Sequence, residues 1–200
     1  SWDKPIEINA ECPEAEKIII KHNSLIVGQI NGAKGVITID PILLGAGPAR
    51  LKPLALFKAE PGKDVHGKPL DINVIPPKAL PPLNPQNIGE LKTGFIIKAK
   101  DKAQIAAEKI DNALLDKAEI HNETEFSING FFDVDKDDVY QFQFNISDLK
   151  IKSLKIDGNE IDWPAFQNSA WWFTPVNLGK GIHKLEIDAV TGKNINIDIR

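Results

Sequence analysis

The chain has 200 residues, of which 42% are hydrophobic and 26% charged, so it can bury one large core or two small ones. Its formal net charge is −4, which argues against the basic surface that non-specific nucleic-acid binding requires. A single cysteine excludes an intrachain disulfide and a cysteine metal cluster. No apolar run approaches the roughly 18 residues of a transmembrane helix, so we expect no membrane insertion.

Short alternating runs of apolar and polar residues fill the first half of the chain, as half-buried strands do. Between two of these runs, His22-Asn23-Ser24 indicates a hairpin turn. Cys12 shares one side of its run with Ile6 and Ile8, which favours a small core residue over a nucleophile. The pattern predicts an immunoglobulin-like β-sandwich. The expected strands are 6–12, 17–21, 25–30, 35–40, 50–57 and 68–74.

A proline-rich segment follows, with five prolines in the ten residues from Pro76 to Pro85. Proline fixes φ and lacks an amide hydrogen, so neither a helix nor a central strand continues through such a segment. The sequence therefore predicts a semi-rigid extended linker with a boundary at about residue 82. We expect one domain over residues 1–82 and a second over 83–200.

The second half also alternates with a period of two. Asp157-Gly158 between two apolar runs is a strong hairpin signal, because both turn residues must tolerate a positive φ. Residues 103–118 fit a helical period only in part and predict one or two short turns. A final alternating run that reaches Arg200 suggests a piece of a longer protein. The expected strands are 95–100, 125–134, 139–146, 149–156, 171–176, 182–189 and 195–199.

The first half resembles a known class of module. The hairpin from Ile18 to Ile30, the stretch from Thr38 to Leu51 and the strand ending at Val74 are similar to the immunoglobulin-like modules of bacterial surface and secreted proteins. This resemblance implies a fold and an extracytoplasmic setting, and it implies no chemistry.

Four blocks of the second half resemble, in type and order, the protective-antigen-type β-sandwich. They are Gly130 to Val134, Asp138 to Phe142, Leu154 to Gly158 and Val176 to His183. That family occurs in bacterial toxins, glycosidases and fungal adhesins, and some members bind glycans. In the sugar-binding adhesins two adjacent aspartates hold calcium, whereas here only Asp148 stands at the corresponding place. Together the resemblances imply an all-β chain of two tandem β-sandwich domains, immunoglobulin-like and then protective-antigen-like, joined by the proline-rich linker.

An aromatic cluster in the second half is the predicted ligand site. Neighbouring residues of a strand point to opposite faces, so one of Trp171 and Trp172 should enter the core. The other should meet solvent, the other domain or a ligand, and sugars stack on exposed aromatic faces. The alternative is that both tryptophans pack, one inside and one against the linker or the first domain. The candidate ligand-binding residues are Trp163, Trp171, Trp172, Asp162, Asn159 and Gln167.

Other polar groups favour structural roles. The acidic cluster Asp133, Asp135, Asp137 and Asp138 lacks the glycine and glutamate that a calcium loop needs, and aspartate favours turns. The four histidines lie in separate segments without ligand spacing. No Gly-x-Ser-x-Gly motif and no phosphate-binding loop occurs in the sequence. We expect no enzyme activity, no catalytic residue, no metal and no cofactor.

The sequence thus predicts a non-catalytic accessory region of a secreted or surface-exposed bacterial protein, with weak carbohydrate binding on the second domain. The expected partners are a polysaccharide or another domain of the parent chain, and the expected location is secreted, periplasmic or cell-surface. Two alternatives stay open: a structural or protein-interaction spacer, and a non-catalytic fragment of a larger hydrolase.

Overall fold

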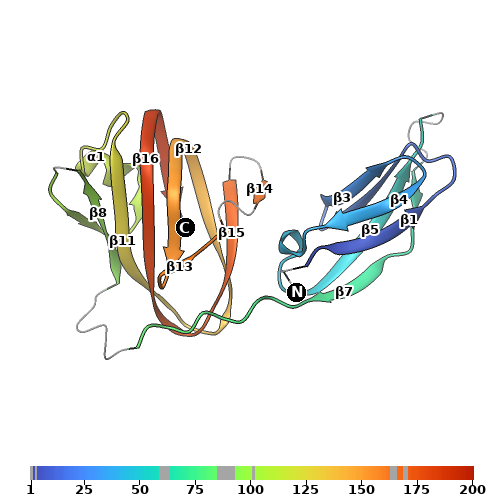
Figure 1. Ribbon diagram of the computed structural model, residues 1–200, viewed down its shortest axis with the longest axis horizontal. Helices are drawn as coiled ribbons and strands as arrows, with labels where there is room; N and C mark the ends of the chain where they lie inside the picture. The colour runs from blue at the N-terminus through green and yellow to red at the C-terminus, as the bar shows by residue number, and fades with distance from the viewer. Residues whose placement is uncertain are drawn as a thin grey trace. The chain divides into compact units, whose positions relative to one another are not determined.

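The computed structural model describes residues 2, 4–58, 64–84, 93–100, 102–162, 166–168 and 171–200. The fold is all-β with antiparallel sheets, and the chain divides into two compact units, Ser1–Pro77 and Lys78–Arg200 (Figure 1). Each unit has its own hydrophobic core. Among the described residues, no helix has the length and apolar character needed to cross a membrane.

In the first unit, two sheets enclose the core. One sheet pairs β1 with β4; the other has the order β3-β2-β5-β6, with β7 paired to β5. Ile20 and Leu51 from the second sheet and Ile37 and Ile39 from the first are fully buried. Cys12 is a free, partly buried thiol that packs against this core, in agreement with the sequence prediction. The elements are β1 (Ile6–Glu11), β2 (Lys17–His22), β3 (Leu25–Asn31), β4 (Lys34–Ile39), the 3-10 turn η1 (Pro41–Leu44), β5 (Gly47–Leu56), β6 (Val65–His66) and β7 (Leu70–Val74).

One continuous sheet forms the second unit, in the order β14-β15-β12-β16-β11-β8-β9, with β13 paired to β12 and β10 to β16. The region 103–118 contains two short strands as well as a helix of six residues. The elements are β8 (Gly94–Ala99), β9 (Ile105–Ala107), β10 (Ile110–Asp111), α1 (Asn112–Lys117), β11 (Glu125–Val134), β12 (Asp138–Ile156), β13 (Asn159–Glu160), β14 (Phe166–Asn168), β15 (Trp171–Leu178) and β16 (Gly181–Ile199).

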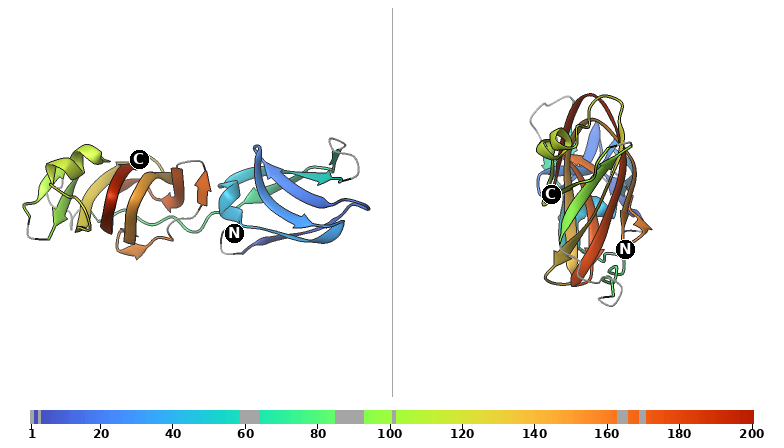
Figure 2. Two further views of the ribbon diagram at one scale, coloured as in Figure 1. Left: turned by 90° about the horizontal axis from the view of Figure 1, so that it is seen from above. Right: turned by 90° about the vertical axis from the view of Figure 1, so that its left-hand side faces the viewer.

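Strands β12 and β16 are each 19 residues long, where the sequence predicted two shorter strands in each case. The first part of β16 lies between β11 and the end of β12, whereas its last residues pair with the middle of β12 and with β10. A register shift in the β12–β16 pairing, between Ser147 and Leu149, marks the place where β12 bends. The two strands thus run through both layers around one core, an arrangement consistent with a β-sandwich (Figure 2).

Part of the proline-rich segment belongs to the second unit. The Leu80 N–H donates to Asn177 O, and Gly179 N–H donates back to Leu80 O, both at 2.9 Å. Leu83 N–H donates to Ile182 O at 2.9 Å, and the Leu80 side chain packs against the core. Residues 80–83 are therefore held along the β15–β16 turn by backbone hydrogen bonds as well as by apolar contact.

Candidate functional site

The two adjacent tryptophans of β15 point to opposite faces of the sheet, as the period of a strand requires. Trp172 lies opposite the fully buried Phe144 and packs against the core. Trp171 lies on the other face and is half-buried. Of this pair, only Trp171 therefore presents its ring on the outer side of the strand.

Arg200, which follows β16 and is paired with Asp198, contacts the Trp171 ring. The Arg200 guanidinium carbon is 4.9 Å from the centroid of the Trp171 ring, within the range of a cation–π contact. Arg200 Nη2 donates to Asp198 Oδ2 at 2.7 Å, and Nε donates to Oδ1 at 3.2 Å. These hydrogen bonds, with the charge of Asp198, raise the pKa of Arg200. The fork-like contact fixes the guanidinium plane beside the indole.

The other predicted ligand-binding residues do not form one site with Trp171. Gln167 is exposed but lies opposite Trp172, so the register places it on the face of that residue. Asn159 pairs with Ile156 at the end of β12, whereas β15 pairs with the beginning of that strand. Asp162 is exposed, and Trp163 lies outside the described residues. The candidate site thus consists of Trp171 with Arg200 and Asp198, two residues that the sequence analysis did not select.

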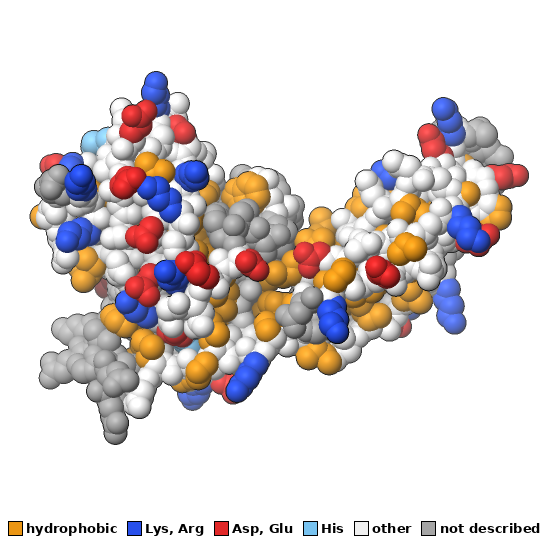
Figure 3. Space-filling model, viewed as in Figure 1, with side chains coloured by type: hydrophobic (Ala, Val, Ile, Leu, Met, Phe, Trp, Pro, Cys, Tyr) orange, Lys and Arg blue, Asp and Glu red, His pale blue; other side chains and the backbone are white. Residues whose placement is uncertain are grey.

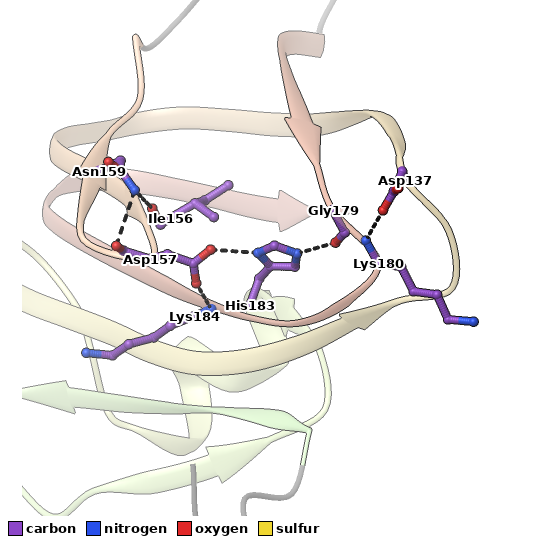
Figure 4. A network of polar contacts seen from close by, with 8 residues as sticks. All are labelled: Asp137, Ile156, Asp157, Asn159, Gly179, Lys180, His183 and Lys184. Carbon is purple, nitrogen blue, oxygen red and sulfur yellow. Dashed lines mark hydrogen bonds and ion pairs between the residues drawn. The ribbon is translucent and has the colours of Figure 1, made fainter. Parts of the chain in front are cut away.

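A network of hydrogen bonds surrounds a buried histidine of the second unit (Figure 4). His183 is fully buried, with Nδ1 at 2.6 Å from Asp157 Oδ2 and Nε2 at 2.7 Å from Gly179 O. Lys184 N–H donates to Asp157 Oδ1 at 2.8 Å, and Asn159 Nδ2 donates to the carbonyls of Ile156 and Asp157. Each ring nitrogen thus has a partner within the protein, the Asp157 carboxylate on one side and the Gly179 carbonyl on the other.

This network joins the β12–β13 turn to the β15–β16 turn and leaves no ring nitrogen for a substrate. Asp157 and Gly158 have φ values of 52° and 78°, as the predicted hairpin turn requires. The roles of Asn159 and His183 are therefore structural: they hold backbone and carboxylate groups of the turns.

The acidic cluster lies at a hairpin turn, where three of its four carboxylates accept hydrogen bonds within the protein. Tyr140 OH donates to Asp135, Lys180 N–H to Asp137 at 2.6 Å and Val139 N–H to Asp138 at 2.8 Å. The hydrogen bond from Lys136 lowers the pKa of Asp138, and the same contact raises the pKa of Lys136. Across the described part of the chain, no group of three histidine, cysteine or acidic side chains is arranged to hold a metal ion.

Asp148, the residue at the place of the adhesin aspartates, fixes the bend of β12 and β16. It adopts a φ of 50°, and its Oδ2 accepts the N–H groups of Lys193 at 2.5 Å and Asn194 at 2.8 Å. A Cβ on Gly192 would lie 1.9 Å from Asp148 Oδ1, so only glycine leaves room for this carboxylate. The backbone hydrogen bonds from Asn194 and then Lys193 lower the pKa of Asp148.

We expect an Asp148→Asn variant to be less stable than the wild type at neutral pH, because an amide NH₂ replaces one of the acceptor oxygens. The folded pKa of Asp148 lies below its ordinary value of 3.8, so its contribution is present above that value and is lost as the pH falls through the lower folded value. Urea unfolding between about pH 2 and pH 7 should show a difference that is constant above about pH 5 and shrinks below about pH 4.

The matched control is Asp116→Asn, an exposed aspartate of α1, which should change stability little at any pH. A difference between wild type and Asp148→Asn that stays the same down to the lowest pH would contradict the role given to the carboxylate.

On the face of the second unit visible in Figure 3, Lys and Arg side chains alternate with Asp and Glu. That face therefore carries no broad patch of a single charge sign. Comparison with known proteins adds no further assignment: no protein-family model matches the chain, and no curated protein matches it.

Proposed function

We propose that this chain is a non-catalytic accessory region of a secreted or surface bacterial protein, and that its second unit binds carbohydrate weakly around Trp171. The observation that carries the proposal is the half-buried Trp171 ring on the outer face of β15, held beside the Arg200–Asp198 pair. An indole fixed in this way offers a flat apolar surface to the C–H groups of a sugar ring. The guanidinium and carboxylate supply a donor and an acceptor for its hydroxyls.

We also propose that the first unit is immunoglobulin-like and the second protective-antigen-like. The all-β fold, the antiparallel sheets and the two separate cores support this assignment. Both classes occur in extracytoplasmic proteins, which supports a secreted, periplasmic or cell-surface location. A polysaccharide, or another domain of the parent protein, is then the partner.

Trp171→Ala tests the carbohydrate proposal. Affinity electrophoresis of the full chain through gels that contain soluble polysaccharides should retard the wild type with at least one of them. The variant should bind that polysaccharide about tenfold more weakly, because the stacking surface is lost. Phe131→Ala, which removes a half-buried aromatic ring from β11, is the matched control and should migrate like the wild type. Absence of retardation for the wild type, or equal retardation of wild type and Trp171→Ala, would sink the proposal.

A structural spacer is the second candidate, and the anchored segment 80–83 favours it. Backbone hydrogen bonds hold this segment on the second unit, which limits the freedom of the chain between the two units. For a spacer without carbohydrate binding, the same electrophoresis should show no retardation with any polysaccharide.

A further inference from the structure

A cavity of about 550 Å³ opens at one end of the second unit, between strands of its two layers. It is distinct from the Trp171 ring, which does not line it. The apolar part of its wall consists of Phe95, Ile110, Phe132, Phe142, Leu185 and Ile199.

Several of these side chains occupy core positions of their strands but stay partly exposed. Phe142 is two residues from the fully buried Phe144, and Phe95 is two residues from the fully buried Ile97, so each shares the face of its buried neighbour. Protein interiors leave few voids larger than a water molecule. An apolar space of this volume falls instead in the range of small-molecule pockets, roughly 300–1,000 Å³.

The aromatic wall of the cavity is fixed by its neighbours. Phe132 and Phe142 meet edge to face, with ring centroids 5.6 Å apart and an angle of 81° between the rings. Phe132 also stacks on the His183 ring at 5.7 Å. Since Asp157 and Gly179 O hold His183, the histidine network supports this wall and keeps it in place without a ligand.

The charges of the cavity lie at its mouth and are of both signs. Glu108, Lys109 and Arg200 are exposed, while Asp111 and Asp198 are half-buried. Arg200 is paired with Asp198, and the Asp111 carboxylate accepts Leu114 N–H at the start of α1. The apolar wall offers no counter-charge to a buried ion, so a charged group of a ligand would have to stay outside.

We propose that this cavity binds an uncharged, ring-containing apolar small molecule, with its rings against Phe132 and Phe142. The two rings are nearly perpendicular, so the pair offers both a ring face and a ring edge to an aromatic or alicyclic ring. The proposal does not depend on the carbohydrate function. Arg200 and Asp198 belong to both sites, but the apolar wall lies within the cavity, and Trp171 does not line it.

The test is a titration of the full chain with N-phenyl-1-naphthylamine, an uncharged two-ring probe that fluoresces strongly in apolar surroundings. The wild type should show saturable, blue-shifted emission at one equivalent of probe. Ile199→Trp, which fills the cavity from its wall, should weaken binding at least tenfold. Ile26→Trp makes the same replacement at an exposed position of the first unit and should bind the probe like the wild type.

Two results would overturn the proposal: a wild type without saturable binding, or an Ile199→Trp variant that binds the probe as tightly as the wild type. If Ile199→Trp does not fold, methyl NMR of the wild type decides the question. Added probe should shift the methyl signals of Ile110 and Leu185 and leave that of Ile37, in the core of the first unit, unchanged. Unshifted Ile110 and Leu185 signals at saturating probe would exclude the cavity as the binding site.

Discussion

An Asp157→Ala variant is expected to lose about 1–3 kcal/mol of unfolding free energy, the usual cost of leaving buried hydrogen-bonding groups without a partner. The substitution takes the acceptor from His183 Nδ1 and from Lys184 N–H at once. His183 is fully buried, so water does not replace the lost carboxylate without opening the turn. Urea unfolding followed by circular dichroism measures the loss.

Asp133→Ala is the matched control, because Asp133 is an exposed aspartate of β11 and should cost less than about 0.5 kcal/mol. Asp157→Asn, which keeps one acceptor oxygen, should fall between Asp157→Ala and the wild type. Similar stabilities for Asp157→Ala and Asp133→Ala would show that the histidine network does not stabilise the fold.

A Gly130→Ala variant should be destabilised by about 3 kcal/mol, because the new methyl group overpacks a rigid contact. A Cβ on Gly130 would lie 2.4 Å from Gly94 O and 2.8 Å from Phe95 Cα, both backbone atoms of β8. Strand β8 would have to move away from β11, and the ladder between them would be disturbed. Thermal unfolding and amide hydrogen exchange in β8 measure the effect.

Gly35→Ala provides the comparison, since Gly35 is also a strand glycine. There the new methyl group would meet only the end of a flexible side chain, Ile30 Cδ1, at 3.2 Å. We expect Gly35→Ala to change stability by less than about 1 kcal/mol. Equal losses for the two variants would mean that the close approach of β8 and β11 is not what makes Gly130 necessary.

Local patterns in the sequence predicted the all-β fold and most of the longer strands, although β12 and β16 were each predicted as two shorter strands. The alternation that placed one of Trp171 and Trp172 inside and the other outside depends only on the period of a strand. The structure has this arrangement, with Trp172 against the core and Trp171 on the other face. The prediction of the Asp157-Gly158 turn also used local information alone, because two adjacent residues there tolerate a positive φ. The hairpin turn at Asn23 and Ser24 was predicted on similar grounds and also has positive φ values.

What the sequence analysis missed depends on pairs that are distant along the chain. Ser147-Asp148 looked like the end of a strand, yet the carboxylate of Asp148 binds the backbone at Lys193 and Asn194 and lets β12 continue through a bend. The contact of Arg200 with Trp171 and the pairing of His183 with Asp157 follow from the register of β12, β15 and β16. No local pattern specifies that register, so the sequence analysis selected neither Arg200 nor His183 as a candidate.

The anchoring of residues 80–83 has a mechanical consequence. A pull on the chain between the two units would load the three backbone hydrogen bonds at Leu80 and Leu83 together with the contact of the Leu80 side chain with the core. Release of these bonds would lengthen the tether by a few residues while both units stayed folded. The segment would then act as a small extensible buffer that absorbs tension and re-forms when the load is removed.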